Sequence, residues 1–195
     1  MIKSYFICII IALVFSMGLN AQSVVKFSLK PNGTFSTEDD KSYTVIEFEG
    51  KTAQELYNMI KANALTLYNN PQKVLHEIEP TNITIRALSD VLLNTYKLGS
   101  GITEYKAMYT LVFQFKDGKI RISAPEIDRN LVVNAMGVPF SKTFISLIDD
   151  WFDKKGAIKK NKQEKVLKVE AILNYPINYL LGNFNKQPKS ETEDW

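Results

Sequence analysis

The groups in this sequence that could carry acid–base or metal chemistry are few. His76, in the stretch VLHEIE, is the only histidine, which excludes the paired-histidine motifs of zinc sites. Glu77 and Glu79 would lie on the opposite face of a strand from His76, so the three side chains are not expected to converge on a metal. Because His76 alternates with Val74 and Ile78, we interpret it as an inward-pointing structural histidine. The sequence therefore predicts no metal and no cofactor.

Adjacent carboxylates are the next candidates for catalysis. They lie at Asp39-Asp40 and Asp149-Asp150, and Asp153 follows the second pair. The two acids of a glycosidase lie about 5 to 9.5 Å apart, which neighbours in sequence rarely supply by themselves. We interpret the first pair as a turn and the second as the solvated edge of an amphipathic helix. No serine has the surroundings of a hydrolase nucleophile, so no catalytic residue is predicted.

A Gly-Lys-Thr step at residues 50–52 raises the question of phosphate binding. A phosphate-binding loop needs another glycine upstream, with four residues between it and Gly50, and that position is Val45. Thr52 and Glu55 instead have the spacing of a capping box, in which each side chain satisfies a free backbone N–H group at a helix start. We interpret the step as a turn into a helix.

The first 21 residues have the pattern of a secretory signal peptide. Lys3 precedes an apolar run over residues 5–18, which closes on Leu19-Asn20-Ala21. An uncleaved membrane anchor is the alternative, but spanning a bilayer takes about 20 apolar residues. We predict cleavage near Ala21 and export to the periplasm or cell envelope.

Composition excludes several further classes of function. Removing residues 1–21 takes one lysine from the 24 basic residues and none of the 21 acidic ones, which leaves a net charge of about +2. The single cysteine, Cys8, lies in the removed segment, so the mature chain has no disulfide, thiol nucleophile or thiolate metal site. Its stability must come from a hydrophobic core.

The apolar pattern of the mature chain changes between strand and helix periods. The β-branched and aromatic stretch 42–49 predicts a strand. From Ala53 the apolar residues follow the i, i+3, i+4, i+7 spacing of one helical face. Further strands are predicted on both sides of a turn at 80–82, over 91–98 and over 105–115.

The clearest local signal is a hairpin at Asp117-Gly118, where both positions tolerate positive φ. We predict that Phe115 pairs with Ile120 and Phe113 with Ile122. This register leaves four polar residues together on the opposite, wet face: Gln114, Lys116, Lys119 and Arg121.

Beyond Pro125 the pattern predicts helices. Ser141 would cap the first, whose buried face would carry Phe144, Leu147, Ile148 and Trp151. The last helix would start near Asn161 with Glu164 completing a cap-like pair, and Pro176 would kink or divide it. Its buried side would carry Val166, Val169, Leu173, Ile177, Leu180 and Phe184.

The order of these elements predicts an α+β domain with helices on one face of an antiparallel sheet. Its order is strand, helix, about four strands and then helices. The predicted segments are a signal peptide (1–21), an extended lead-in with at most one short strand (22–41), the α+β domain (42–153), a basic linker and C-terminal helix packed on the domain (154–185) and a disordered tail (186–195).

Three stretches resemble the family called domain of unknown function 4468, which is described as having a TATA-binding-protein-like fold. They are EFEGKTAQELYNMIKA, ITIRAL and YTLVFQFKDGKIRISAPEI, and together they lie within roughly Tyr43 to Trp151. The resemblance implies this fold and a secreted bacterial protein. It brings no known activity, cofactor or catalytic residue.

Two basic surfaces are candidates for partner binding. The wet sheet face carries Lys106, Lys116, Lys119 and Arg121, which we take as the possible surface for an envelope protein. Nucleic acid is not predicted as a partner, because export removes the protein from the genome and a fold does not define a function. The segment Lys154–Lys168 holds seven lysines and one glutamate. It is either a solvated linker or a weak contact with an anionic membrane surface.

The function predicted from these features is a non-enzymatic module of the bacterial envelope that binds a protein or a small ligand. The alternative is a hydrolase that acts on an envelope sugar or peptide through acidic residues. A third hypothesis is an apolar ligand held between sheet and helices by four aromatic residues that are otherwise plain core: Tyr57, Tyr68, Tyr109 and Trp151. The sequence leaves the oligomeric state open.

Overall fold

A long central strand organises the protein. The computed structural model describes residues 24–97, 101–135 and 138–183. Within them, β7 (Gly101–Lys116) pairs along one edge with β5 (Asn82–Leu88) and then β6 (Leu93–Lys97). Its other edge pairs with β8 (Lys119–Ser123) and then β9 (Glu126–Ala135). All of these pairings are antiparallel.

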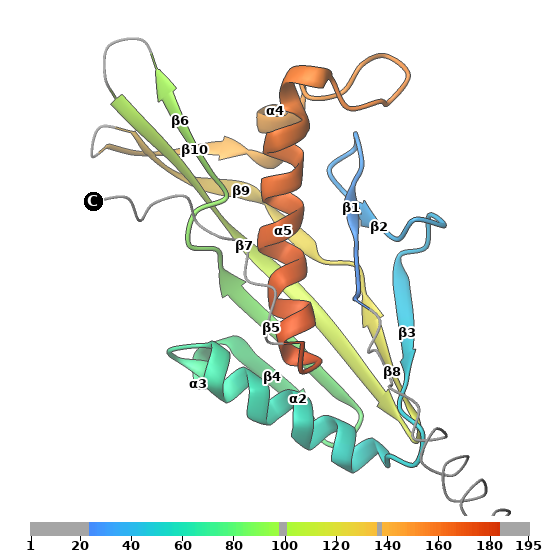
Figure 1. Cartoon of the computed structure of the whole chain (residues 1–195). Coiled ribbons are helices and arrows are strands. Elements are labelled where there is room, and N and C mark those ends of the chain that lie inside the picture. The colour runs from blue at the N-terminus through green and yellow to red at the C-terminus, as the bar shows by residue number, and fades with distance from the viewer. Residues whose placement is uncertain (1–23, 98–100, 136–137, 184–195) are drawn as a thin grey trace, which may run out of the picture.

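Three further strands widen the sheet. β4 (Leu75–Ile78) pairs with β5, β3 (Tyr43–Glu47) pairs with β8, and β10 (Val138–Thr143) pairs with β9. A separate two-stranded sheet is formed by β1 (Ser28–Leu29) and β2 (Phe35–Ser36). Figure 1 shows the twist of the large sheet behind the helices.

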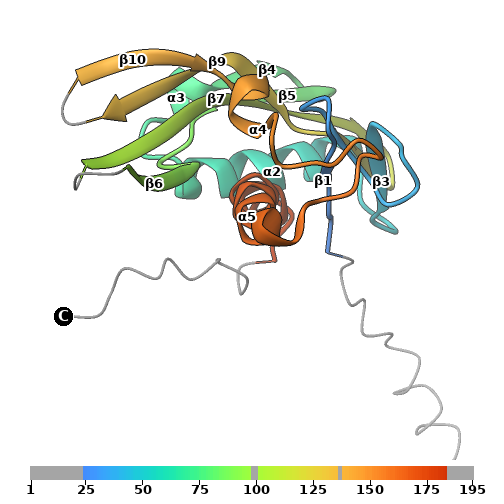
Figure 2. The ribbon, with the colours of Figure 1, turned by 90° about the horizontal axis from the view of Figure 1, so that it is seen from above.

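The long helices α2 (Ala53–Leu67) and α5 (Gln163–Leu180) lie on the same side of the sheet, which leaves the other face open (Figure 2). The short elements are α3 (Pro71–Val74), α4 (Phe144–Ile148) and a 3₁₀ turn, η1 (Lys160–Lys162). This confirms the predicted α+β class. Among the helices that the structure describes, none is both long enough and apolar enough to cross a membrane.

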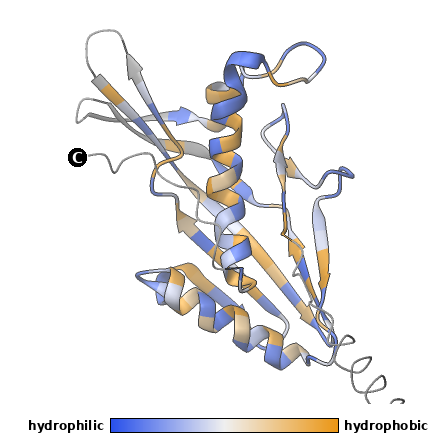
Figure 3. Ribbon diagram, viewed as in Figure 1, coloured by the Kyte–Doolittle hydropathy of each residue, from blue (hydrophilic) through white to orange (hydrophobic). Residues whose placement is uncertain are grey.

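The local signals before Pro125 predicted the structure well. Thr52 and Glu55 form the capping box, with Glu55 N–H donating to the Thr52 hydroxyl and Thr52 N–H to the Glu55 carboxylate. In the hairpin, Phe115 pairs with Ile120 and Phe113 with Ile122, as predicted. The turn contains Gly118 at a φ of +76°. Figure 3 shows the resulting apolar stripes on the helices and strands.

The prediction of helices directly after Pro125 was wrong. The chain continues as β9 and β10, and helix α4 begins only at Phe144, capped by Thr143 rather than Ser141. The cap-like pair predicted for the last helix is absent too, because α5 starts at Gln163 without a side-chain cap. The helix runs undivided through Pro176.

The predicted buried face of α5 is observed. All of its described members are buried: Val166, Val169, Leu173, Ile177 and Leu180. Phe184, the tail 186–195 and the predicted signal peptide lie outside the described residues.

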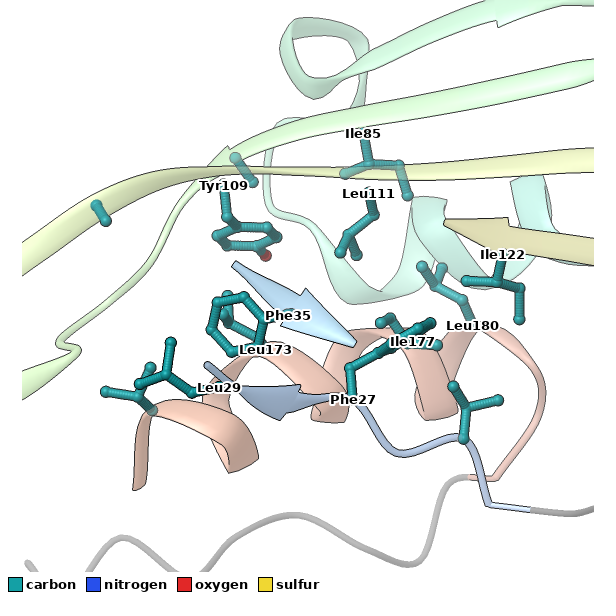
Figure 4. Packing of buried hydrophobic residues seen from close by; sticks show 14 of the residues in the cluster. Phe27, Leu29, Phe35, Ile85, Tyr109, Leu111, Ile122, Leu173, Ile177 and Leu180 are labelled. Atoms are coloured by element: carbon teal, nitrogen blue, oxygen red, sulfur yellow. The ribbon is translucent and has the colours of Figure 1, made fainter. Parts of the chain in front are cut away.

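The segment before Tyr43 is part of the core and not a simple lead-in. It contains two short strands where the sequence predicted at most one. Phe27, Leu29 and Phe35 are buried, and they lie between α5 and the sheet (Figure 4). The intervening Lys26 is exposed, so residues 25–29 have the alternation of a half-buried strand.

A ladder of polar side chains on α5 holds the backbone of this segment. The Asn178 side chain accepts from Val25 N–H and donates to Val25 C=O, at 2.9 and 2.8 Å. Asn174 makes the same two bonds to Phe27, both at 2.8 Å, and Glu170 accepts from Leu29 N–H at 2.8 Å. Three side chains spaced four residues apart thus replace a neighbouring strand. We call Glu170, Asn174 and Asn178 the polar ladder.

Glu170 makes the stability of this contact depend on pH. Burial raises the pKa of its carboxyl group, although the Leu29 N–H group and Lys26 and Lys30 oppose the shift. A raised folded pKa means that the contribution to stability is complete below the unfolded pKa and is lost as pH rises through the folded value. Glu170→Gln keeps an oxygen acceptor for Leu29 without the charge.

We therefore expect the urea midpoint of Glu170→Gln to rise relative to that of the wild type as pH rises from about 4 to about 8. Chemical denaturation across that range measures this, with Glu164→Gln, an exposed acid on the same helix, as the control. Parallel pH curves for the wild type and Glu170→Gln would contradict the expectation.

Candidate binding face of the sheet

The open face of the sheet is built by strict alternation along β7. Odd-numbered residues such as Leu111 and Phe113 are buried under the helices. The even-numbered residues from Lys106 to Lys116 point to the opposite face and are partly or fully exposed, because successive side chains of a strand alternate between faces.

The strand registers align one open-face residue from each of five neighbouring strands. In order across the sheet, this row consists of Ile78, Asn82, Gln114, Arg121 and Val45. With strands about 4.8 Å apart, the row spans about 19 Å. Its centre holds two amides and a guanidinium, and its apolar ends remain 68% exposed at Ile78 and 41% exposed at Val45. We call these five residues the cross-sheet row.

Arg121 is held in place by its neighbours. Its Nη1 donates to Gln114 Oε1 at 3.0 Å, and its guanidinium carbon lies 4.2 Å from the centre of the Tyr43 ring. Stacking on a ring and a hydrogen bond fix the plane of a guanidinium, which reduces the entropy it loses on binding a carboxylate. Arg121 is therefore a pre-oriented cation on an exposed surface.

A second arginine on this face already has an acidic partner. Arg86 Nη2 lies 2.7 Å from Asp128 Oδ2, an ion pair that links β5 to β9 across β7. Both side chains are partly exposed, so the pair contributes little to stability, less than about 1 kcal/mol. It does neutralise this part of the face.

The structure brings together three of the four predicted site residues. Lys116 lies opposite Lys119, and Arg121 follows on the same face of β8. Lys106 is ten residues earlier on β7, or about 33 Å away at strand rise. Glu47 lies opposite Lys119, so the gathered cations are not a purely basic patch.

His76 is exposed on β4, so the expectation that it points inward was wrong. Glu77 does lie on the other face, toward α2, where the Tyr57 hydroxyl donates to it and Lys61 Nζ lies 2.8 Å away. Burial alone would raise the pKa of Glu77, but the hydrogen bonds from Lys61 and Tyr57 lower it overall. Glu79 accepts from Gln54 at 2.8 Å. Glu77 on β4 and Glu79 just beyond its end both contact α2, and the two acids do not converge with His76.

Three of the four adjacent aspartates each have a separate lysine partner. Asp39 pairs with Lys41, Asp40 with Lys30 and Asp150 with Lys162, each at 2.5 Å. Over residues 24–97, 101–135 and 138–183, no group of three or more His, Cys, Asp or Glu could hold a metal, and Glu170 is the one buried carboxylate.

The aromatic residues proposed to hold an apolar ligand belong to the core. Tyr57, Tyr109 and Trp151 are buried. The Tyr57 ring packs edge-on against Phe115, with centroids 5.8 Å apart. The hydroxyl groups of Tyr68 and Tyr109 lie 3.2 Å apart, and burial raises the pKa of both.

Sequence reasoning missed Tyr43 and the two apolar ends of the cross-sheet row, Ile78 and Val45, as parts of this surface. The register of the hairpin predicted Gln114 beside Arg121, but the pairing of β3 with β8 and of β4 with β5 joins segments that are far apart in sequence or carry weak strand patterns.

Comparison with known proteins identifies the fold but assigns no activity. Residues 43–129 match a family model described as a domain of unknown function (DUF4468) with TBP-like fold. A TBP-like protein from Parabacteroides distasonis is 16% identical, with 72% of this chain and 86% of that one covered and a TM-score of 0.46. A DUF4468 family protein from Bacteroides ovatus is 11% identical, with 88% and 95% covered and a TM-score of 0.48. No curated protein matches the chain.

Proposed function

We propose that this chain, whose residues 43–129 belong to the family of domain of unknown function 4468 with TBP-like fold, is a non-enzymatic binding module of the bacterial cell envelope. The open sheet face binds a partner protein, with Arg121 at the centre of the contact. The partner presents a carboxylate between apolar side chains, which matches a pre-oriented guanidinium in a row whose two ends are the apolar Ile78 and Val45.

The observation that carries this proposal is the cross-sheet row. Protein interfaces are enriched in arginine and aromatic residues, and an arginine that is already oriented is well suited to be a hot spot. Arg121 stacked on Tyr43 has this character. Export to the envelope is supported by the pattern of residues 1–21.

Site-specific photo-crosslinking in the source bacterium tests the proposal. A photoreactive amino acid is placed at Val45 or Ile78 on the open face, or at Leu65, an exposed position on α2, as the control. We expect the two face positions, and not Leu65, to form an adduct of one mass, and we expect Arg121→Glu to reduce its yield at least tenfold.

Two results would overturn the proposal. One is an absence of adducts at both face positions under conditions in which the protein is folded and exported. The other is an adduct whose yield is unchanged in Arg121→Glu. A mass that equals twice that of the chain would make the partner a second copy.

A further inference from the structure

The lysine-rich connection between α4 and α5 forms one end of the molecule. Residues 154–168, the basic segment, comprise the later part of this connection and the first turns of α5. They carry seven lysines against one glutamate, a local net charge of +6. In Figure 1 the connection forms the top of the molecule, and Figure 3 shows it and the start of α5 as mostly hydrophilic.

The connection is a structured loop. The Asp153 carboxylate accepts from the N–H groups of Lys155 and Ala157 at 2.8 and 3.0 Å. Lys159 N–H donates to the carbonyl of buried Trp151 at 2.9 Å. These bonds close the loop on itself at Asp153 and join its backbone to the core at Trp151.

Most of these lysines have no acidic partner. Of the seven, Lys162 alone forms an ion pair within the described part of the chain, with Asp150 at 2.5 Å. The hydrogen bond from Lys162 outweighs partial burial and, with the charges of Lys159 and Lys165, lowers the pKa of Asp150. The remaining six cations repel one another and gain free energy when an anionic surface approaches.

Two apolar side chains stand among the cations. Ile158 is 39% exposed at the loop and Leu167 is 60% exposed on the first turns of α5. A soluble polyanion makes no use of such groups, whereas the interfacial region of a bilayer takes up exposed apolar side chains beside lysines. The combination of lysines with exposed apolar side chains therefore favours a bilayer over a soluble polyanion.

We propose that the basic segment is a peripheral contact site for an anionic lipid bilayer, with its unpaired lysines on the headgroup phosphates and with Ile158 and Leu167 at the interface. Each lysine near such a surface contributes about 1 kcal/mol, a factor of about five in partitioning. Several together give reversible binding that weakens with salt.

The positions of Val25 and the basic segment at opposite ends of α5 indicate whether the cleaved or the uncleaved chain makes this contact. The polar ladder holds Val25 beside Asn178, near the end of α5, whereas the basic segment lies at the start of that helix. Eighteen residues of helix separate the two ends by about 27 Å. An uncleaved anchor would hold the wrong end at the membrane, so the proposal applies to the chain cleaved near Ala21.

Flotation of the mature chain, residues 22–195, with lipid vesicles tests the proposal. Vesicles of phosphatidylcholine alone are compared with vesicles that also contain phosphatidylglycerol, at low and at physiological salt. The variant Lys155→Glu/Lys160→Glu is compared with Lys51→Glu/Lys73→Glu, which makes the same change in net charge at exposed sites on α3 and before α2.

We expect the wild type and the Lys51/Lys73 variant to bind phosphatidylglycerol vesicles at low salt. The Lys155/Lys160 variant should bind at least about 25-fold more weakly, with an unchanged unfolding midpoint, and Leu167→Ser should bind several-fold more weakly. Equal losses in the two double variants would show an effect of net charge only and would overturn the proposal. Failure of the wild type to bind, or competition by soluble glycerol phosphate, would do so too. None of these outcomes depends on the sheet-face partner.

Discussion

Replacing Phe27 by alanine is expected to lower the free energy of unfolding of the mature chain by about 3–5 kcal/mol, the range for a fully buried phenylalanine. The side chain has no exposed surface and lies between α5 and the sheet (Figure 4). Its loss removes apolar contacts on both sides and leaves a cavity that neither layer can close. Chemical denaturation of residues 22–195 measures the change.

Lys26→Ala is the matched control for Phe27→Ala. Lys26 is the adjacent residue, but its side chain is exposed, so its replacement should change the unfolding free energy by less than about 0.5 kcal/mol. A loss below about 1 kcal/mol for Phe27→Ala would mean that residues 24–29 add little to the core in solution.

The second large effect is expected for Asn178→Ala, at about 2–4 kcal/mol. The Asn178 amide pairs with both the N–H and the C=O of Val25 and also donates to the Asn174 carbonyl at 2.9 Å. Alanine leaves the two backbone groups of a buried residue without partners, and each such group costs about 1–3 kcal/mol. Chemical denaturation gives the total loss.

Asn174→Ala separates this effect from a general weakening of α5. Asn174 makes the equivalent bonds to Phe27 but is only partly buried, so water can replace part of what is lost. We expect Asn178→Ala to cost more than Asn174→Ala and to speed hydrogen exchange at the Val25 amide first. The reverse order of costs would contradict the assigned role of the polar ladder.

The parts of the fold that the sequence predicted correctly are those with local causes. The capping box needs only Thr52 and Glu55 three residues apart. The hairpin register follows from one two-residue turn and the alternation on each side of it. Because that register was correct, the gathering of Lys116, Lys119 and Arg121 at one end of the sheet was predictable as well.

In strand β9 a bulge conceals the alternation that would identify a strand. The register between β7 and β9 shifts between Ala107 and Tyr109. As a result, Ile127 and Leu131 pair with neighbouring inward residues of β7 although they are four residues apart. A spacing of four residues between apolar side chains is not the alternation of a strand and suits a helix as well.

The role of residues 24–29 depends on a partner about 150 residues away, which no local pattern identifies. A signal existed in α5 itself, where Glu170, Asn174 and Asn178 place polar groups at intervals of four within a buried helix. Buried polar groups need partners, and unpaired backbone elsewhere in the chain was available to supply them.

On the open face, too, the features with local causes were predicted and those that depend on distant strands were not. Its four basic residues were identified by alternation, but the length of β7 separates Lys106 from the rest. The stacking of Arg121 on Tyr43 results from the pairing of β8 with β3, which are more than seventy residues apart in sequence.

The polar ladder has a natural limit to its length. Four residues of helix advance about 6.0 Å, whereas two residues of strand advance about 6.6 Å, so the two repeats drift apart by about 0.6 Å at each step. Over the three residues of the ladder the offset between helix and strand reaches about 1.2 Å, which side-chain rotation can absorb. With a fourth residue the offset would exceed the tolerance of a hydrogen bond. The positions of a fourth step are occupied by Val166 and, beyond the end of α5, by Gly182, and neither residue has a polar side chain. The mismatch between the two repeats therefore limits how many residues of a helix can hydrogen-bond to one strand. The polar ladder, with three residues, reaches that limit.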